Sequence, residues 1–240
     1  MIDPIALIEL TNLKASGQLG ALAQHPQLGM KPEWMGELAK DKRIVVRYHL
    51  AQNPALSSGT EAARHLSKDR SKNVRRYLAL NPALARLSDA VEKLSTDKDW
   101  VVRTALAENP AIASSPEVAQ TLAADKYWFV RWCLTKNPAI ASSPEVAQTL
   151  ASDKLPPVRQ ALAHNPAITE FPEIVAKLAS DEDWRVRQSL ADNPAITSIP
   201  AITKKLAKDS VSIVRDAAVH TAAFRRIQQT TLPVPTHTVL

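Results

Sequence analysis

The sequence predicts an all-α solenoid, a stack of short helix pairs, and three regularities support that fold class. Aspartate recurs every 28 residues, an arginine follows six residues after each aspartate, and a valine precedes each arginine. Asn-Pro then follows six of the seven arginines at a constant distance. A fixed period of this length is typical of stacked repeats, in which each unit contacts its neighbours. The two columns are Asp41, Asp69, Asp97, Asp125, Asp153, Asp181 and Asp209, and Arg47, Arg75, Arg103, Arg131, Arg159, Arg187 and Arg215.

Residues 109–136 show how one repeat is expected to fold. A residue before proline is biased away from the α conformation, so Asn109 should end the preceding helix. Ser115 and Pro116 suit the N-cap and the first position of a first helix, and Asp125 is predicted to cap a second one. Apolar residues four apart give each helix one apolar stripe. Helices this short are marginal alone, so neighbouring copies must supply the missing partner surface.

Two columns of leucine are the predicted core. One belongs to the first helix of each repeat and the other to the second helix. Alanine follows the second leucine in most copies, which lets helices approach closely. The columns are Leu38, Leu66, Leu94, Leu122, Leu150, Leu178 and Leu206, and Leu50, Leu78, Leu106, Leu134, Leu162 and Leu190.

The repeat pattern also predicts the domain organisation. Residues 1–28 form a degenerate repeat and are predicted to be N-terminal capping helices. Residues 29–229 form the repeat solenoid, about seven helix pairs with a C-terminal capping helix, because Thr221 and Ala222 replace the Asn-Pro that would end it. Residues 230–240 are predicted to be a disordered tail.

Composition narrows the functional classes. The net charge is +6, and residues 41–80 carry all of it, with nine lysines and arginines against three acids. No apolar run is long enough for a membrane span, and the start of the chain does not resemble a secretory signal, so we expect a cytoplasmic protein without membrane association. One cysteine, Cys133, excludes an internal disulfide and a cysteine-held metal site, and it is predicted to be a small buried core residue. We expect neither a metal nor a cofactor.

The repeated unit Leu-Ala-x-Asp-x₄-Val-Arg-x₂-Leu-Ala-x-Asn-Pro, found over residues 38–222, resembles the leucine-rich repeat variant (LRV) family, a relative of HEAT repeats. The units here are longer than the family's usual ones. The resemblance implies a right-handed α–α superhelix whose second helices line the concave side. It also implies that each Asp–Arg pair bridges neighbouring repeats. Most HEAT-like proteins are protein-binding scaffolds, whereas the HEAT-like alkylpurine DNA glycosylases bind DNA on a concave face with aromatic residues and an acid.

An exposed stripe of the second helices is the predicted binding surface. It comprises the residues three before, one after and five after each repeat arginine, and four of the five tryptophans fall on it. Tryptophan is favoured in interface hot spots. Alternatively, these rings pack over the seams between repeats. The predicted binding residues are Trp100, Trp128, Trp132, Trp184, Tyr48, Lys72 and Arg76.

We therefore expect a non-enzymatic scaffold that binds a protein or peptide along its concave surface. The alternative is a nucleic-acid-binding protein that uses the basic 41–80 region, in the extreme case a glycosylase-like one with Glu108 or Asp192 as its carboxylate. A continuous positive strip from Lys72 and Arg76 to the tryptophans would favour nucleic acid. A neutral aromatic groove would favour protein.

Overall fold

The computed structural model describes residues 4–58 and 60–231, and over these ranges the chain is all α-helical, with sixteen α-helices, seven short 3₁₀ helices and no strand. It divides into two compact units, residues 1–143 and residues 144–240, which are described separately below. None of the helices in the described ranges has the length and apolar character needed to cross a membrane.

The first unit repeats the order α-helix, α-helix, 3₁₀ helix. Its elements are α1 (Pro4–Ala15), α2 (Leu19–Gln24), η1 (Pro26–Met30), α3 (Pro32–Ala39), α4 (Ile44–Gln52), η2 (Pro54–Ser58), α5 (Thr60–Leu66), α6 (Lys72–Leu80), η3 (Pro82–Arg86), α7 (Ser88–Ser95), α8 (Trp100–Glu108), η4 (Pro110–Ser114), α9 (Pro116–Ala123), α10 (Trp128–Leu134) and η5 (Pro138–Ser142).

The second unit continues the same order and ends on a long helix. Its elements are α11 (Pro144–Ala151), α12 (Pro156–His164), η6 (Pro166–Glu170), α13 (Pro172–Leu178), α14 (Trp184–Ala191), η7 (Pro194–Ser198), α15 (Pro200–Leu206) and α16 (Ser212–Thr231). Helix α16 runs two residues beyond the predicted end at Gln229. Residues 230 and 231 of the predicted disordered tail are therefore helical, and residues 232–240 lie outside the described residues.

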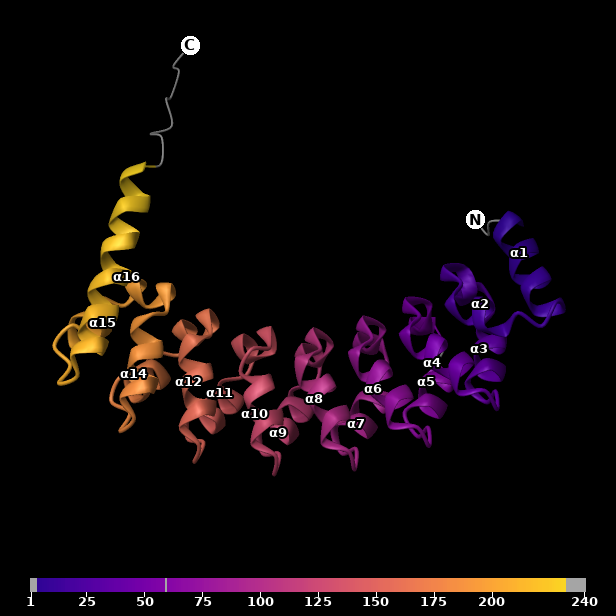
Figure 1. The fold of residues 1–240 in the computed structure, drawn as a ribbon, viewed down its shortest axis with the longest axis horizontal. Helices are drawn as coiled ribbons and strands as arrows, with labels where there is room; N and C mark the ends of the chain where they lie inside the picture. Colours follow the sequence, from indigo (N-terminus) through magenta and orange to yellow (C-terminus); the bar gives the residue numbers. More distant parts are fainter. Residues whose placement is uncertain (1–3, 59, 232–240) are drawn as a thin grey trace, which may run out of the picture. The chain divides into compact units, whose positions relative to one another are not determined.

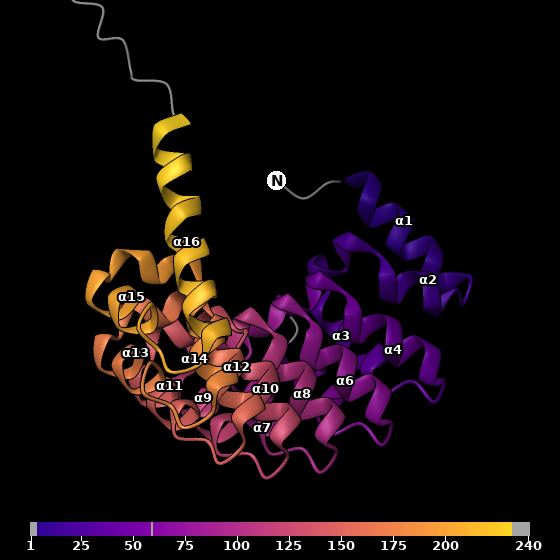
Figure 2. The ribbon, with the colours of Figure 1, turned by 60° about the vertical axis from the view of Figure 1, so that its left-hand side comes forward.

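Within the first unit, equivalent helices of successive repeats lie side by side in three rows (Figures 1 and 2). Helices α2, α4, α6, α8 and α10 form one row, α3, α5, α7 and α9 form a second, and η1 to η5 form a third. In the second unit, α12, α14 and α16 stack in the same way, as do α11 with α13 and η6 with η7. The predicted solenoid stacking is confirmed within each unit. The right-handed superhelix stays a prediction.

The third row of helices was not predicted. Asn109 ends α8 in extended conformation as expected, but the chain then forms η4 before α9 begins at Pro116 with Ser115 as its N-cap residue. The prediction that Asp125 caps the second helix is wrong, because α10 begins only at Trp128. Asp125 instead accepts a hydrogen bond from the backbone N–H of Tyr127, at 2.8 Å, in the turn before the helix.

The core consists of three columns of apolar side chains. Every leucine of the two predicted columns is at most 3% exposed. The 3₁₀ helices add a third column, since the residue three positions after each Asn of Asn-Pro, and after His25 in the first copy, is fully or almost fully buried as well. This column is Leu28, Leu56, Leu84, Ile112, Ile140, Ile168 and Ile196.

The Asp and Arg columns bridge neighbouring repeats, as the resemblance implied. Arg75 on α6 donates to the carboxylate of Asp97 in the next repeat, with Nε to Oδ2 at 2.6 Å and Nη2 to Oδ1 at 3.0 Å. Its Nη1 also donates to the carbonyl of Asp69 in its own repeat, at 2.7 Å. The same pair recurs as Arg47 with Asp69, Arg103 with Asp125, Arg159 with Asp181 and Arg187 with Asp209.

The Asn of Asn-Pro forms a second ladder between repeats. Asn81 Nδ2 donates to the carbonyls of Ala51 and Asn53 in the preceding repeat, at 2.8 and 3.0 Å. Its Oδ1 accepts from the backbone N–H of Ala83 and so caps η3. The buried amide of Asn81 therefore ends one helix, caps the next and holds the two repeats in register. Equivalent bonds to the preceding repeat are made by Asn53, Asn109, Asn137 and Asn193.

Candidate functional site

Two exposed tryptophans begin the second helices of consecutive repeats in the first unit. Trp100 is the first residue of α8 and is 38% exposed, and Trp128 is the first residue of α10 and is 44% exposed. Because α8 and α10 lie side by side, these equivalent positions are neighbours on one surface. Two large indole rings are thus left open to solvent.

Five aromatic residues, Trp100, Tyr127, Trp128, Phe129 and Trp132, join into one aromatic cluster. Trp100 stacks on Tyr127, with ring centroids 5.9 Å apart, and meets the Phe129 ring edge-on at 6.0 Å. Phe129 also touches Trp128 edge-on at 5.6 Å and stacks on Trp132 at 5.3 Å. Trp100 therefore packs across the seam between two repeats, as the alternative interpretation expected, yet it keeps an exposed face.

Trp132 is more enclosed than its neighbours in the cluster. Phe129 stacks on its ring, and the Lys136 ammonium lies 3.4 Å from its centroid, so the side chain is half-buried. The equivalent position in the preceding repeat is Thr104, whose side-chain hydroxyl is buried and makes no hydrogen bond. Trp100 and Trp128 are therefore the more accessible tryptophans of the cluster.

The predicted basic residues lie on α6, one repeat before the cluster. Lys72 is exposed, but its ammonium is 3.3 Å from the carboxylate of Asp99. Burial alone would raise the pKa of Asp99. The hydrogen bond from the backbone N–H of Val101 and the nearby Lys72 ammonium have a larger opposite effect, so the pKa is lowered overall. Arg76 is half-buried and lies over the Tyr77 ring, 5.4 Å from its centroid. A carboxylate thus interrupts the path from these cations to Trp100.

Tyr48 and Trp184 lie apart from the cluster. Tyr48, on α4, is half-buried against Tyr77, with ring centroids 4.6 Å apart. Trp184 begins α14 in the second unit, is half-buried, and has the Arg185 guanidinium 5.2 Å from its ring. The predicted site is therefore divided: Trp100, Trp128 and Trp132 come together in the first unit, and Trp184 belongs to the second.

Cys133 is a buried core residue, as predicted. It is 1% exposed, and its thiol donates to the Glu108 carboxylate at 3.3 Å. Burial, with this hydrogen bond, raises the pKa of Cys133 to about 12, so the thiolate needed for nucleophilic chemistry is scarce at neutral pH. Among the described residues, no three or more His, Cys, Asp or Glu side chains are placed to hold a metal ion.

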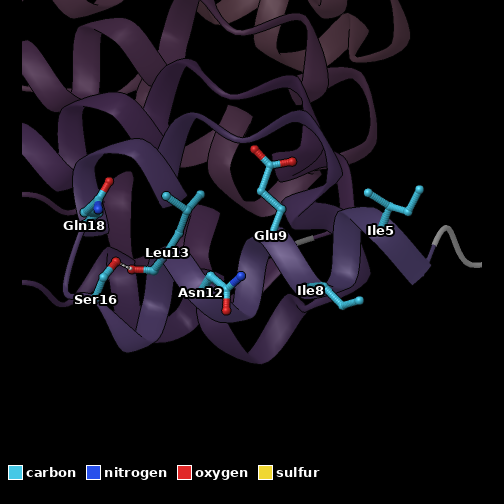
Figure 3. Close-up of a pocket in the computed structure, with 7 residues that line it drawn as sticks. All are labelled: Ile5, Ile8, Glu9, Asn12, Leu13, Ser16 and Gln18. Carbon is cyan, nitrogen blue, oxygen red and sulfur yellow. Dashed lines mark hydrogen bonds between the residues drawn. The ribbon is translucent and has the colours of Figure 1, made fainter.

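Two open clefts lie elsewhere on the units. One, of about 430 Å³, lies along α1 and is lined by Ile5, Ile8, Glu9, Asn12, Leu13, Ser16 and Gln18 (Figure 3). The other, of about 660 Å³, lies in the second unit and is lined mainly by α11 and the start of α13, with Glu145, Glu170 and Glu173 beside Phe171. Neither cleft contains a predicted binding residue.

Sequence reasoning missed two members of the aromatic cluster. Tyr127 is the N-cap residue of α10 and Phe129 is its second residue, and neither is on the stripe defined by the repeat arginine. Their signal was present, since residues 127–129 are three consecutive aromatics and the equivalent positions of other repeats hold at most one. Aromatic density would have found them where helical spacing did not.

The described residues define a helical-repeat protein. In a comparison with solved structures, the chain is similar to one described as a leucine-rich repeat variant with a novel repetitive protein structural motif. That similarity covers 82% of this chain and 84% of the other, with 20% sequence identity and a TM-score of 0.44. It names the same kind of repeat that the sequence motif resembles. No protein-family model and no curated protein matches the chain.

Proposed function

We propose that this protein is a non-enzymatic scaffold that binds a protein segment through the aromatic cluster on α8 and α10. The observation that carries this proposal is the exposure of Trp100, Tyr127 and Trp128, which are between 38% and 45% exposed on one surface. Grouped exposed aromatics are typical of interaction sites on soluble chains, and tryptophan and tyrosine dominate the hot spots of protein interfaces. The resemblance to LRV repeats predicts that this surface is concave.

The charges around the cluster support a protein partner over a nucleic acid. Asp99 lies between Lys72 and the start of α8, and Glu108 ends the same helix. A phosphate backbone gains affinity from a continuous line of cations, and Asp99 interrupts the line from Lys72 to the cluster. A protein segment can place an apolar side chain on the rings and hydrogen-bond donors on the carboxylates.

The chemistry of the surrounding residues supports a binding role without catalysis. Cys133 is buried with a raised pKa, and Glu108, one of the two carboxylates considered for a glycosylase-like acid, accepts a hydrogen bond from that thiol. We place the protein in the cytoplasm because its one cysteine is a free thiol, as is usual in a reducing compartment.

The test is selection from a random peptide library on the full chain, followed by affinity measurements with variants. Replacing Trp100 and Trp128 by alanine should weaken the selected peptides about thirtyfold or more, since truncating a hot spot costs about 2 kcal/mol or more. The far-UV circular dichroism should stay unchanged. Trp34→Ala is the matched control, because Trp34 is a half-buried tryptophan on α3, in the other row of helices.

Two results would contradict the proposal. One is a selection that yields no peptide. The other is a set of peptides that bind the Trp100→Ala, Trp128→Ala variant as tightly as the unaltered chain, which would place the binding surface elsewhere.

A further inference from the structure

A basic residue directly follows the ladder aspartate in four consecutive repeats of the first unit. Each of these four residues is exposed, and none forms an ion pair within the described part of the chain. They lie in the turns between the two rows of α-helices. We call this set the basic column, and it comprises Lys42, Arg70, Lys98 and Lys126.

The neighbouring carboxylates are already engaged. Asp69, which precedes Arg70, is held by Arg47, and Asp97 and Asp125 are held in the same way by the arginines of their preceding repeats. Asp41, at the start of the ladder, is held by Arg43 through two hydrogen bonds of 3.0 Å. The positive charge of the basic column is therefore not neutralised by the aspartates beside it.

The ladder bonds also fix the spacing of the basic column. They hold equivalent turns of successive repeats together, and packed helices lie about 8–10 Å apart, so one cation recurs at about that distance. A peptide in the polyproline II conformation has three residues per turn and rises about 3.1 Å per residue, so every third side chain lies on the same side, about 9 Å from the last. A peptide running across the repeats would therefore meet one cation with every third side chain.

The basic column leads into the aromatic cluster. The Lys126 ammonium lies 5.9 Å from the ring of Tyr127, which stacks on Trp100. Lys98 is two residues before Trp100 in the turn that begins α8. A segment bound along the basic column would reach the exposed rings at its end.

We propose that the partner segment is an acidic peptide in the polyproline II conformation, with a carboxylate at about every third residue along the basic column and an apolar residue on the aromatic cluster. This inference rests on the proposed function and specifies its partner. One unpaired cation per repeat matches such a peptide in charge and spacing. It is sparse for a nucleic acid, which carries a phosphate on every nucleotide.

The experiment uses the peptides selected on the full chain from a library of about 12 residues, the length that spans four repeats at three residues each in the polyproline II conformation. The selected peptides should be enriched in Asp and Glu, and their binding should weaken as salt is raised. Lys98→Gln with Lys126→Gln should weaken binding about two- to thirtyfold, because exposed ion pairs contribute about 0.2–1 kcal/mol each. Lys93→Gln with Lys204→Gln removes the same charge from α7 and α15, away from the basic column, and should change binding little.

The other outcomes show whether the inference alone or the proposed function as well is wrong. Selected peptides without acidic enrichment, but dependent on Trp100 and Trp128, would overturn the inference and leave the scaffold function standing. An equal loss in the Lys93, Lys204 control would show unspecific attraction and overturn it as well. If a thymidine oligonucleotide displaces the acidic peptides at a concentration below their own dissociation constant, the inference is wrong and single-stranded nucleic acid is the partner. A selection that yields nothing would contradict both.

Discussion

Removing one arginine of the ladder should destabilise the first unit strongly, and Arg75 is the clearest place to test it. Its side chain is 5% exposed, as is that of its partner Asp97. Arg75→Ala deletes two charge-assisted hydrogen bonds to Asp97 and one to the carbonyl of Asp69. The Asp97 carboxylate then stays buried with only the backbone N–H of Asp99 as a donor.

The expected cost is about 3–5 kcal/mol, the range found when one member of a buried ion pair is removed. Summing the lost bonds at about 1.5–3 kcal/mol each would give a larger cost, but water entering the space that the arginine leaves solvates part of the Asp97 carboxylate. For a chain of this length, about 2–4 °C per kcal/mol corresponds to a melting temperature lower by about 6–20 °C. Thermal melts followed by far-UV circular dichroism measure the shift.

Two variants separate the buried pair from a general effect of substitution. Arg76→Ala, the next residue of α6, removes a half-buried guanidinium that forms no ion pair within the described residues, and should cost about 1 kcal/mol or less. Arg75→Ala combined with Asp97→Ala should recover part of the loss, since no uncompensated charge remains. A melt of Arg75→Ala superimposable on that of the unaltered chain, or a double variant less stable than the single one, would refute the reasoning.

Three further predictions follow from polar groups in or beside the core. Arg187 holds the pKa of Asp209 below its ordinary value, so the stability that this ion pair contributes is present above about pH 3.9 and is lost as the pH falls through the lowered pKa. Asp209→Asn should therefore flatten the acid side of a plot of melting temperature against pH, and an unchanged acid side would contradict this. Cys133, with its pKa raised to about 12, should react with a disulfide reagent at pH 8 only as the protein unfolds, and rapid labelling of the folded chain would count against its burial. Thr104→Val replaces a buried hydroxyl that has no partner and should raise the free energy of unfolding by about 1 kcal/mol, measured as a higher urea midpoint.

The parts of the fold that repeat with the helical period were predictable from sequence. Leu94 and Leu106 belong to columns whose spacing along a helix points to burial, and both are fully buried. The 3₁₀ helices were not predictable in the same way, because a five-residue segment such as Pro110–Ser114 is too short to show a periodicity. Asn109 was recognised only as a stop signal, since its bonds to the preceding repeat depend on tertiary structure.

The tryptophans of the candidate site were predictable as a group, and their surroundings were not. Spacing from the repeat arginine identified Trp100, Trp128 and Trp132 together, but it did not identify Tyr127 and Phe129, whose rings lie against them. Phe129 covers one face of Trp132, and this decides which tryptophans stay accessible. A column along the stack specifies which residues are neighbours, whereas exposure depends on the size of every residue around each ring.

The repeat divides structural from binding positions within a single helix. At the arginine position of α4, α6 and α8 the residue never changes, because Arg47, Arg75 and Arg103 each hold the next repeat by the same bonds. Three residues earlier, the same helices carry Ile44, Lys72 and Trp100, side chains of unrelated chemistry that the ladder does not use. Substitution at the first position should therefore change stability, and substitution at the second should change binding with the fold intact. Because the stack accommodates isoleucine and lysine at the second position, the fold does not require a tryptophan there, which is consistent with the proposed binding role.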